Sequence, residues 1–360
     1  MITRTEATAG VAAAVRASRA TGIGPVALAS SMLIVVAAFA VMMGASTIPP
    51  LTTLAIILDR LPFMTLAVDA PVGWQRIVLE VRLPRVLTAG LAGAALAYSG
   101  ATYQGVFRNP LADPFLLGVA SGAALGAAIA IMTPLDAGPY GFGWVPLFAF
   151  GGAALAVVIA YSAAHVGLAR SNTSLILAGV AVSSVAGAVT SFIMLNGGER
   201  VLAIFAFLFG SFNTANWERA VLAIPYLAVG TAVIAIHGRL LNVLQLDEEQ
   251  AAQLGVNVAR TKLVLLAAAS LVAATAVAMA GVIGFVGLVV PHLVRLLFGV
   301  DYRRVLPLSA LIGASFLIGA DVLSRTLLRP QEVPVGIVTA VIGGPFFLYV
   351  MRTRRIGGGL

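Results

Sequence analysis

Residues 263–282 read Leu263-Val-Leu-Leu-Ala-Ala-Ala-Ser-Leu-Val-Ala-Ala-Thr-Ala-Val-Ala-Met-Ala-Gly-Val282, a run with no charged side chain. A helix needs about 20 mostly apolar residues to cross the hydrocarbon core of a bilayer. This run therefore predicts a transmembrane helix. Nine further segments of similar character are predicted to span the membrane: Val26–Ala45, Val86–Val106, Phe115–Met132, Val145–His165, Ser174–Leu195, Ala220–His237, Leu288–Phe298, Val305–Leu323 and Gly336–Met351.

The composition of the whole chain leads to the same fold class. Of its 360 residues, 60% are hydrophobic and 10% are charged, and the mean hydropathy is +1.02. An average soluble domain has about 25% charged residues, and this chain has too few polar side chains to cover a soluble fold. We therefore expect an all-α polytopic membrane protein with about ten transmembrane helices per protomer. The net charge of +8 is interpreted as arginines at the membrane faces, not as a nucleic-acid site.

The distribution of basic residues predicts the topology. With the N-terminus in the cytoplasm, 14 of the 22 lysines and arginines fall in cytoplasmic segments and 8 in external ones. This bias favours both termini inside. The expected organisation is a cytoplasmic N-terminal segment (1–25), a single transmembrane domain (26–351) and a cytoplasmic tail (352–360). The first apolar run is interpreted as an uncleaved helix and not as a signal peptide.

The residues that enzymes and metal sites require are scarce. Cysteine is absent, and no two of His165, His237 and His292 are three or four residues apart. The chain has no Gly-x-Ser-x-Gly elbow and no phosphate-binding loop, so we expect no catalytic residue, no metal site and no ATP hydrolysis by this chain itself. Asp321 is the only acid well inside a predicted span, which argues against a buried proton relay.

The most polar part of the chain, residues 244–260, is predicted to be cytoplasmic. Asp247 is positioned to cap a short helix whose first turn holds Glu248 and Glu249, where the positive end of the helix dipole favours acids. Gly255 is typical of a helix C-cap, and a second short helix is expected over Val256–Arg260. The alternative is a solvated interfacial loop. A short apolar segment, Val201–Phe209, is predicted to be a half-helix that does not span.

Five stretches together resemble the permease family of ATP-binding-cassette importers for iron–siderophore, haem and cobalamin. They are Arg82-Leu-Pro-Arg85, Gln104-Gly-Val-Phe-Arg-Asn-Pro-Leu-Ala-Asp-Pro114, Asp247–Val258, Gly284-Phe-Val-Gly-Leu-Val-Val-Pro-His292 and Glu332-Val-Pro-Val-Gly-Ile-Val-Thr-Ala-Val-Ile-Gly-Gly-Pro345. The third is similar to the Glu-Ala-Ala-x-x-x-Gly motif of importers but is one residue shorter, as is usual for importers of large chelates.

The resemblance implies a permease domain that works as a homodimer in the bacterial inner membrane. It implies two cytoplasmic ATPase subunits, which hold the ATP and Mg, and an external substrate-binding protein. The chain itself would bind no cofactor and no nucleic acid, and lipid would surround it. The cargo would be a metal chelate: iron–siderophore or haem first, and cobalamin next.

The resemblance also implies roles for particular residues. The residues that would dock the binding protein are Arg82, Arg85 and Arg325. The alternative role for these arginines is to anchor helix ends at the lipid headgroups. The residues that would couple the permease to the ATPase are Asp247, Glu248, Glu249, Ala251, Ala252, Leu254, Gly255 and Val256. The residues that would form the cytoplasmic gate are Asn109, Leu111, Asn172, Thr173 and Ser174. Phe205 and Phe209 either line the pathway or pack within the protein.

Two other functions are compatible with a polytopic membrane protein. The first is a secondary carrier for a bulky hydrophobic solute, and the absence of membrane-buried charge pairs in the predicted spans argues against it. The second is a membrane-embedded hydrolase, against which the lack of a serine–histidine or histidine–aspartate constellation argues.

Overall fold

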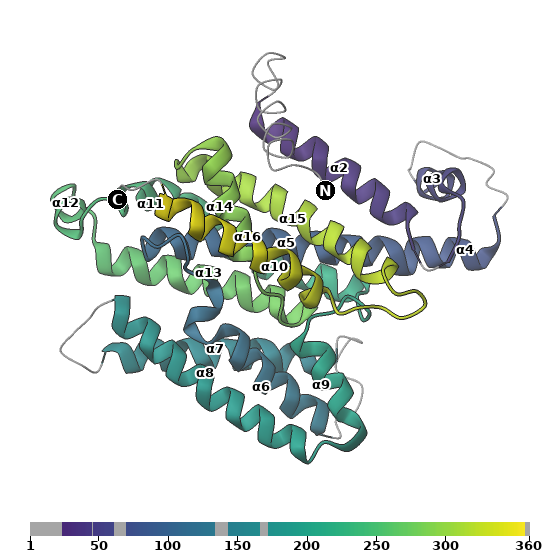
Figure 1. The fold of residues 1–360 in the computed structure, drawn as a ribbon, viewed down its shortest axis with the longest axis horizontal. Helices are drawn as coiled ribbons and strands as arrows, with labels where there is room; N and C mark the ends of the chain where they lie inside the picture. Colours follow the sequence, from purple (N-terminus) through teal and green to yellow (C-terminus); the bar gives the residue numbers. More distant parts are fainter. Residues whose placement is uncertain (1–23, 45, 61–69, 134–142, 166–171, 357–360) are drawn as a thin grey trace.

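The computed structural model describes residues 24–44, 46–60, 70–133, 143–165 and 172–356. Fifteen helices in these ranges carry the labels of Figure 1. They are α2 (Pro25–Met42), α3 (Pro50–Leu58), α4 (Val72–Arg76), α5 (Leu83–Val106), α6 (Val119–Met132), α7 (Trp144–His165), α8 (Asn172–Leu195), α9 (Val201–Leu208), α10 (Trp217–Ile236), α11 (Gly238–Val243), α12 (Glu248–Gln253), α13 (Val258–Ala280), α14 (Val286–Phe298), α15 (Tyr302–Thr326) and α16 (Val335–Ile356).

The ten predicted spans correspond to α2, α5 to α8, α10 and α13 to α16. Of these, α2, α7, α8, α10, α13 and α15 are long and apolar enough to cross a membrane, and α6, α14 and α16 contain shorter apolar segments. The tenth, α5, has 24 residues but is richer in Gly, Ser, Thr and Tyr. Most of its side chains are buried against other helices, so α5 faces protein where a peripheral span would face lipid.

The predicted boundaries differ from the structure at both ends of the chain. The second span was expected to begin at Val86, but a wider π-helical turn (Ile77–Arg82) joins α4 to α5 in one helical stretch. Such a turn relaxes the regular ladder just before Pro84, which has no N–H to donate. At the other end, α16 continues to Ile356, into the predicted tail. Residues 1–23 and 357–360 lie outside the described residues.

The helices form two groups (Figure 1). In the first, α5 is packed against α10, α13, α14 and α15, and α2 lies along α15. In the second, α6, α7 and α8 pack on one another, and α13 connects the groups by packing on α7. Close approach of α5 to α14 requires glycine: a Cβ placed on Gly100 would lie 2.0 Å from the carbonyl oxygen of Gly287. Small residues allow transmembrane helices to approach in this way.

Candidate transport and coupling sites

At one end of the α5–α15 pair lies a cluster of arginines, which we call the arginine cluster: Arg82, Arg85 and Arg325. The guanidinium of Arg85 donates to both carboxylate oxygens of Asp321, with an Nη2–Oδ1 distance of 2.8 Å. It also donates to Glu332, with an Nη2–Oε2 distance of 2.9 Å. Arg85 is 8% and Asp321 1% exposed. This is a bidentate, charge-assisted contact away from water.

The other two arginines hold the C-terminal end of α2. Arg82 donates from Nη1 to the carbonyl oxygen of Val41, at 3.0 Å. Arg325 donates to the carbonyl oxygens of Ala40, at 2.7 Å, and Met43, at 2.9 Å. The last carbonyls of a helix have no partner within the helix, and the dipole makes that end favourable for cations. The two guanidinium groups therefore cap α2.

Docking of a partner protein directly on Arg82, Arg85 and Arg325 would require exposed side chains, and this requirement is not met, because all three side chains are buried. The reason is that each finds an acceptor from a distant segment: the end of α2, Asp321 or Glu332. Asp321, the lone acid in a predicted span, was the signal for this pairing. An acid in that position predicts a buried basic partner as well as the absence of a proton relay.

The predicted coupling segment forms a short helix followed by a glycine turn. The helix is α12, and its last carbonyls accept hydrogen bonds from Gly255 N (Ala252 O, 2.9 Å) and Val256 N (Ala251 O, 3.2 Å). Gly255 has φ +80°, the left-handed conformation in which glycine ends a helix without strain. Leu254, beside the turn, is 64% exposed. The segment thus presents an apolar side chain at a fixed turn.

Two details of that prediction are wrong. Asp247 precedes α12, but its side chain makes no capping hydrogen bond; its carboxylate instead lies 3.3 Å from Arg108 Nη1. The second helix begins at Val258, where Asn257 caps it by accepting from Arg260 N. It is not a short helix, because it continues as the span α13.

Hydrogen bonds attach the coupling segment to the far ends of α5 and α15. Arg108, after α5, donates to Leu246 O at 3.1 Å, and Gln245 donates to Gly105 O at 3.0 Å. Asn242 accepts from the backbone N of Tyr302, the first residue of α15, at 2.9 Å. No role was predicted for Arg108, Gln245 or Asn242, because their partners are far away in the chain.

Asn242 also donates to Asp301, which caps the start of α15, at 2.7 Å. This bond and the one from the backbone N of Arg303 lower the pKa of Asp301, the Arg303 bond most of all. Asp301 therefore stays ionised at neutral pH.

The residues assigned to the gate lie at two chain connections. Asn109 forms a tight turn after α5, in which its side chain accepts from Leu111 N at 2.9 Å. Leu111 lines a small crevice that also involves His292 of α14 and Phe346 of α16. Asn172, Thr173 and Ser174 form the first turn of α8, next to residues 166–171, which lie outside the described part. A joint role for the two connections stays a prediction.

The predicted half-helix is present as α9, and the side chains of Phe205 on the helix and Phe209 at its C-cap form an exposed pair. The rings of Phe205 and Phe209 are stacked, with centroids 6.2 Å apart and planes at 9°. They are 44% and 45% exposed, so neither is enclosed in the protomer. The opposite face of α9 is buried through Ile204.

Backbone hydrogen bonds fix α9 to the rest of the fold. The break between α13 and α14 donates from Val282 N to Phe207 O, at 3.0 Å. The start of α16 donates from Val335 N to Gly210 O, at 3.1 Å, and from Gly336 N to Phe209 O, at 2.9 Å. The backbone N–H and C=O groups at these three connections are thus paired with one another. Backbone polar groups inside a membrane need such internal partners, because lipid offers none.

Comparison with known proteins shows which family has this architecture. The family model described as the FecCD transport family matches residues 32–353. The chain belongs to the FecCD transport family. That match includes the arginine cluster, the coupling segment, the α13–α14 break and α9.

Relatives and a solved structure agree with the family assignment. The chain is 43% identical over 340 residues, 92% of this chain and 90% of the relative, to the cobalamin import system permease protein BtuC of Halobacterium salinarum. It is 42% identical to the hemin transport system permease protein HmuU of Yersinia pestis, over 78% of this chain and 84% of the relative. A solved metal-chelate type ABC transporter, in an inward-facing conformation, matches 84% of this chain and 97% of its own with a TM-score of 0.69 and 36% identity.

These findings confirm the resemblance inferred from the five sequence stretches. A FecCD family chain is a transport permease with several membrane-spanning helices. The comparisons support that assignment and give no support to the secondary carrier. The expected absence of buried charge pairs, which argued against that carrier, is wrong, because Arg85 and Asp321 form one between α5 and α15. The individual roles assigned to the arginine cluster, coupling segment, gate and aromatic pair stay predictions.

Proposed function

We propose that this chain is the membrane permease of an ATP-driven importer for a metal chelate, and that it forms the translocation pathway as a homodimer. The observation that carries the proposal is identity of 43% with a cobalamin import permease over 92% of the chain. The preferred cargo is an iron–siderophore or haem, with cobalamin next. Phe205 and Phe209 support a bulky cargo, because an exposed stacked pair provides an apolar face, and the family resemblance implies that this face lies beside the pathway.

The proposed partners follow from the coupling segment and from the lack of a phosphate-binding loop. Two cytoplasmic ATPase subunits bind ATP and Mg, and an external binding protein delivers the chelate. The assembly lies in a bacterial inner membrane with both chain termini in the cytoplasm, so the arginine cluster is at the external face.

Labelling single cysteines, placed at Gln331 and at Gln250 in this cysteine-free chain, from one side of sealed vesicles tests that orientation. Modification of both from the same side would contradict it.

The test of the function is uptake into proteoliposomes that contain the permease, its ATPase and its binding protein. We expect ATP-dependent, saturable accumulation of one class among ferric siderophores, haem and cobalamin. Free ferric and divalent ions should not accumulate, because no group of three or more acidic or histidine side chains in the described residues is arranged as a metal site. Saturable uptake of an unchelated ion, or uptake of a chelate without the ATPase, would contradict the proposal.

The coupling role can be tested at Gly255. In Gly255→Val we expect at least a tenfold loss of ATP-driven uptake, because a β-branched residue is strained at φ +80°. A Cβ at this position meets no other atom within 4 Å, so the loss would come from the turn and not from a clash. The matched control is Gly255→Asn, since asparagine tolerates the left-handed conformation, and it should retain most uptake. The two variants should bind the ATPase with different affinities in a pull-down; equal affinities and equal uptake would refute the assignment.

Docking of the binding protein at the arginine cluster stays part of the proposal, in a modified form. The guanidinium groups are buried, so a docking acid would compete with Glu332, whose side chain is the more exposed partner of Arg85, at 28%. Competition of this kind predicts tighter binding in Glu332→Gln and weaker binding with added salt. Affinity that responds to neither change would remove the arginines from the docking surface.

A further inference from the structure

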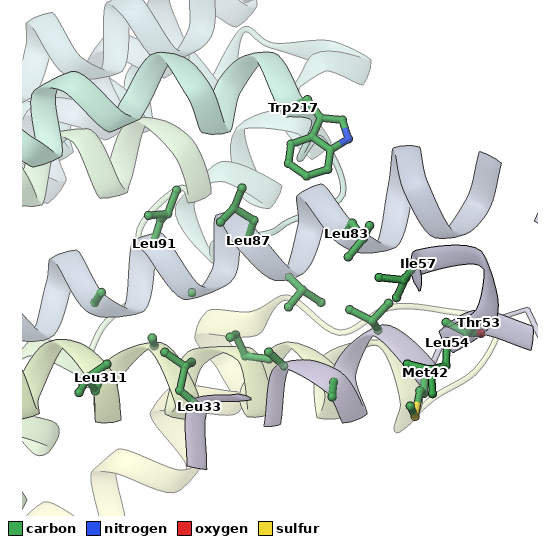
Figure 2. Close-up of a pocket in the computed structure, with 18 of the residues that line it drawn as sticks. Leu33, Met42, Thr53, Leu54, Ile57, Leu83, Leu87, Leu91, Trp217 and Leu311 are labelled. Carbon is green, nitrogen blue, oxygen red and sulfur yellow. The ribbon is translucent and has the colours of Figure 1, made fainter. Parts of the chain in front are cut away.

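A large apolar cavity lies between α2 and α5, and we call it the α2–α5 cavity. Its volume is about 670 Å³, and its walls come from α2, α3, α5 and α15, with Trp217 of α10 at one side. Figure 2 shows Leu33, Leu91 and Leu311 at one end and Met42, Ile57 and Leu83 at the other. The cavity is part of neither the coupling segment nor the aromatic pair of α9.

Small residues from three helices form part of the walls. Ala37 on α2, Ala94 on α5 and Ala310 on α15 all line the cavity, beside longer apolar side chains such as Leu33 and Leu91. Arg82 and Arg325 donate to the last carbonyls of α2, beside Val41 and Met42, which line one end of the cavity.

The walls define the chemistry of an occupant. Thr53 and Trp217 carry the polar side-chain groups among the lining residues, and both groups already donate within the protein: the Thr53 hydroxyl to Pro49 O and the Trp217 indole N–H to Leu79 O. No side chain of the described lining offers a charge, so a headgroup, an ion or a chelate has no partner there. An apolar cavity of about 150 Å³ already stays dry and takes up benzene. A cavity several times larger with such walls suits a hydrocarbon chain.

The dimensions and the opening indicate which hydrocarbon. From Leu33 to Met42 the cavity follows α2 for roughly 14 Å, at about 1.5 Å per residue, which is about half of a hydrocarbon core of about 30 Å. That is the depth of one leaflet. Leu54, Leu87 and Trp217 line the cavity and are also exposed on the molecular surface, so the cavity opens sideways toward the bilayer. The indole N–H of Trp217 donates to Leu79 O at 2.8 Å, which fixes this side chain at the opening.

We propose that the α2–α5 cavity binds one acyl chain of a membrane phospholipid. The acyl chain would lie between α2 and α5, where the two helices have little direct contact. Few residues of α2 are buried: Ala29, Ala40 and Val41. The acyl chain therefore supplies a substantial part of the apolar surface against which α2 packs. The lipid belongs to the leaflet on the side of the arginine cluster.

The test uses two variants that fill the cavity from different walls, Ala37→Phe and Ala310→Leu, and one control. The control is Ala228→Phe, on an exposed position of α10 that does not line this cavity. Native mass spectrometry of the purified protein should find one retained phospholipid per protomer in the unchanged protein and the control. Both filled variants should lose it at least fivefold. Equal retention in all four proteins would overturn the proposal.

A second measurement locates the chain independently. Trp74→Phe with Trp144→Phe leaves Trp217 as the one tryptophan, since the chain has three. In phosphatidylcholine vesicles with bromine on mid-chain carbons, Trp217 fluorescence should be quenched at least twofold less in the filled variants than in the control. Equal quenching contradicts an acyl chain in the cavity.

A Leu33→Cys variant of this cysteine-free chain also tests for a second copy of the protein, since efficient cross-linking between protomers at Leu33 would overturn the lipid assignment.

Discussion

Arg85→Met is expected to lower the free energy of unfolding by about 3–5 kcal/mol, the cost of removing one partner from a buried ion pair. The Asp321 carboxylate would stay almost fully buried, at 1% exposure, without its bidentate partner. Arg325 cannot replace Arg85 fully. Its Nε lies 3.4 Å from Asp321, while its terminal nitrogens are held by Ala40 and Met43.

Two further variants separate the buried pair from a general effect of losing an arginine. Arg85→Met combined with Asp321→Leu should recover part of the loss, because the buried carboxylate is removed together with its main partner, while Arg325 loses its contact with Asp321 but keeps its bonds to Ala40 and Met43. Arg108→Met removes an exposed contact to Asp247 and should cost at most about 1 kcal/mol. Thermal unfolding of the purified variants in detergent measures all three. Similar losses in Arg85→Met and Arg108→Met would show that the Arg85–Asp321 pair is not buried.

Gly100→Ala should have the second-largest effect. The added Cβ would lie 2.0 Å from Gly287 O and 2.5 Å from Gly287 Cα, and backbone atoms cannot rotate out of the way. Accommodating it requires α5 and α14 to separate, which also breaks the bonds from Gln104 Nε2 to Gly287 O and Leu288 O, at 3.2 and 3.3 Å. Overpacking of a core costs about 1–3 kcal/mol, and the lost hydrogen bonds add to it. We expect little folded protein in the membrane.

The control for this prediction is Gly151→Ala on α7. A Cβ there meets nothing within 4 Å, so the change should be neutral or gain up to about 1 kcal/mol from helix propensity. The yield of monodisperse protein after extraction and its unfolding temperature compare the two variants. If Gly100→Ala behaves like Gly151→Ala, the close approach of α5 and α14 is not present in the membrane.

Hydropathy was sufficient to predict the spans but not the position of each span in the bundle. A run such as residues 263–282 needs only its own composition to be recognised, because lipid is the solvent on every exposed side. The start of the helical stretch was missed because a π-helical turn over Ile77–Arg82 leads directly into α5, which has Pro84 in its first turn. No local residue signals such a turn. The central position of α5 follows from its contacts with four other helices, which composition does not specify.

The candidate sites divide in the same way between local and distant interactions. Gly255 was predicted correctly as the glycine that ends a helix, one residue after the C-cap Leu254, because positive φ is a local property of the chain. Burial of Arg82 and Arg325 was not predicted, since their acceptors are carbonyl groups of α2, which any sequence possesses. The contact of Arg108 with Leu246 was missed for the same reason.

The two arginines that cap α2 form their bonds at very different times during synthesis. Arg82 follows Val41 by 41 residues, whereas Arg325 follows Ala40 by 285 residues. At about 5–20 residues per second, the ribosome adds Arg325 roughly 15–60 s after Ala40. Until Arg325 is added, α2 has at most one of its two caps, and its final attachment depends on the chain as far as α15 having entered the membrane.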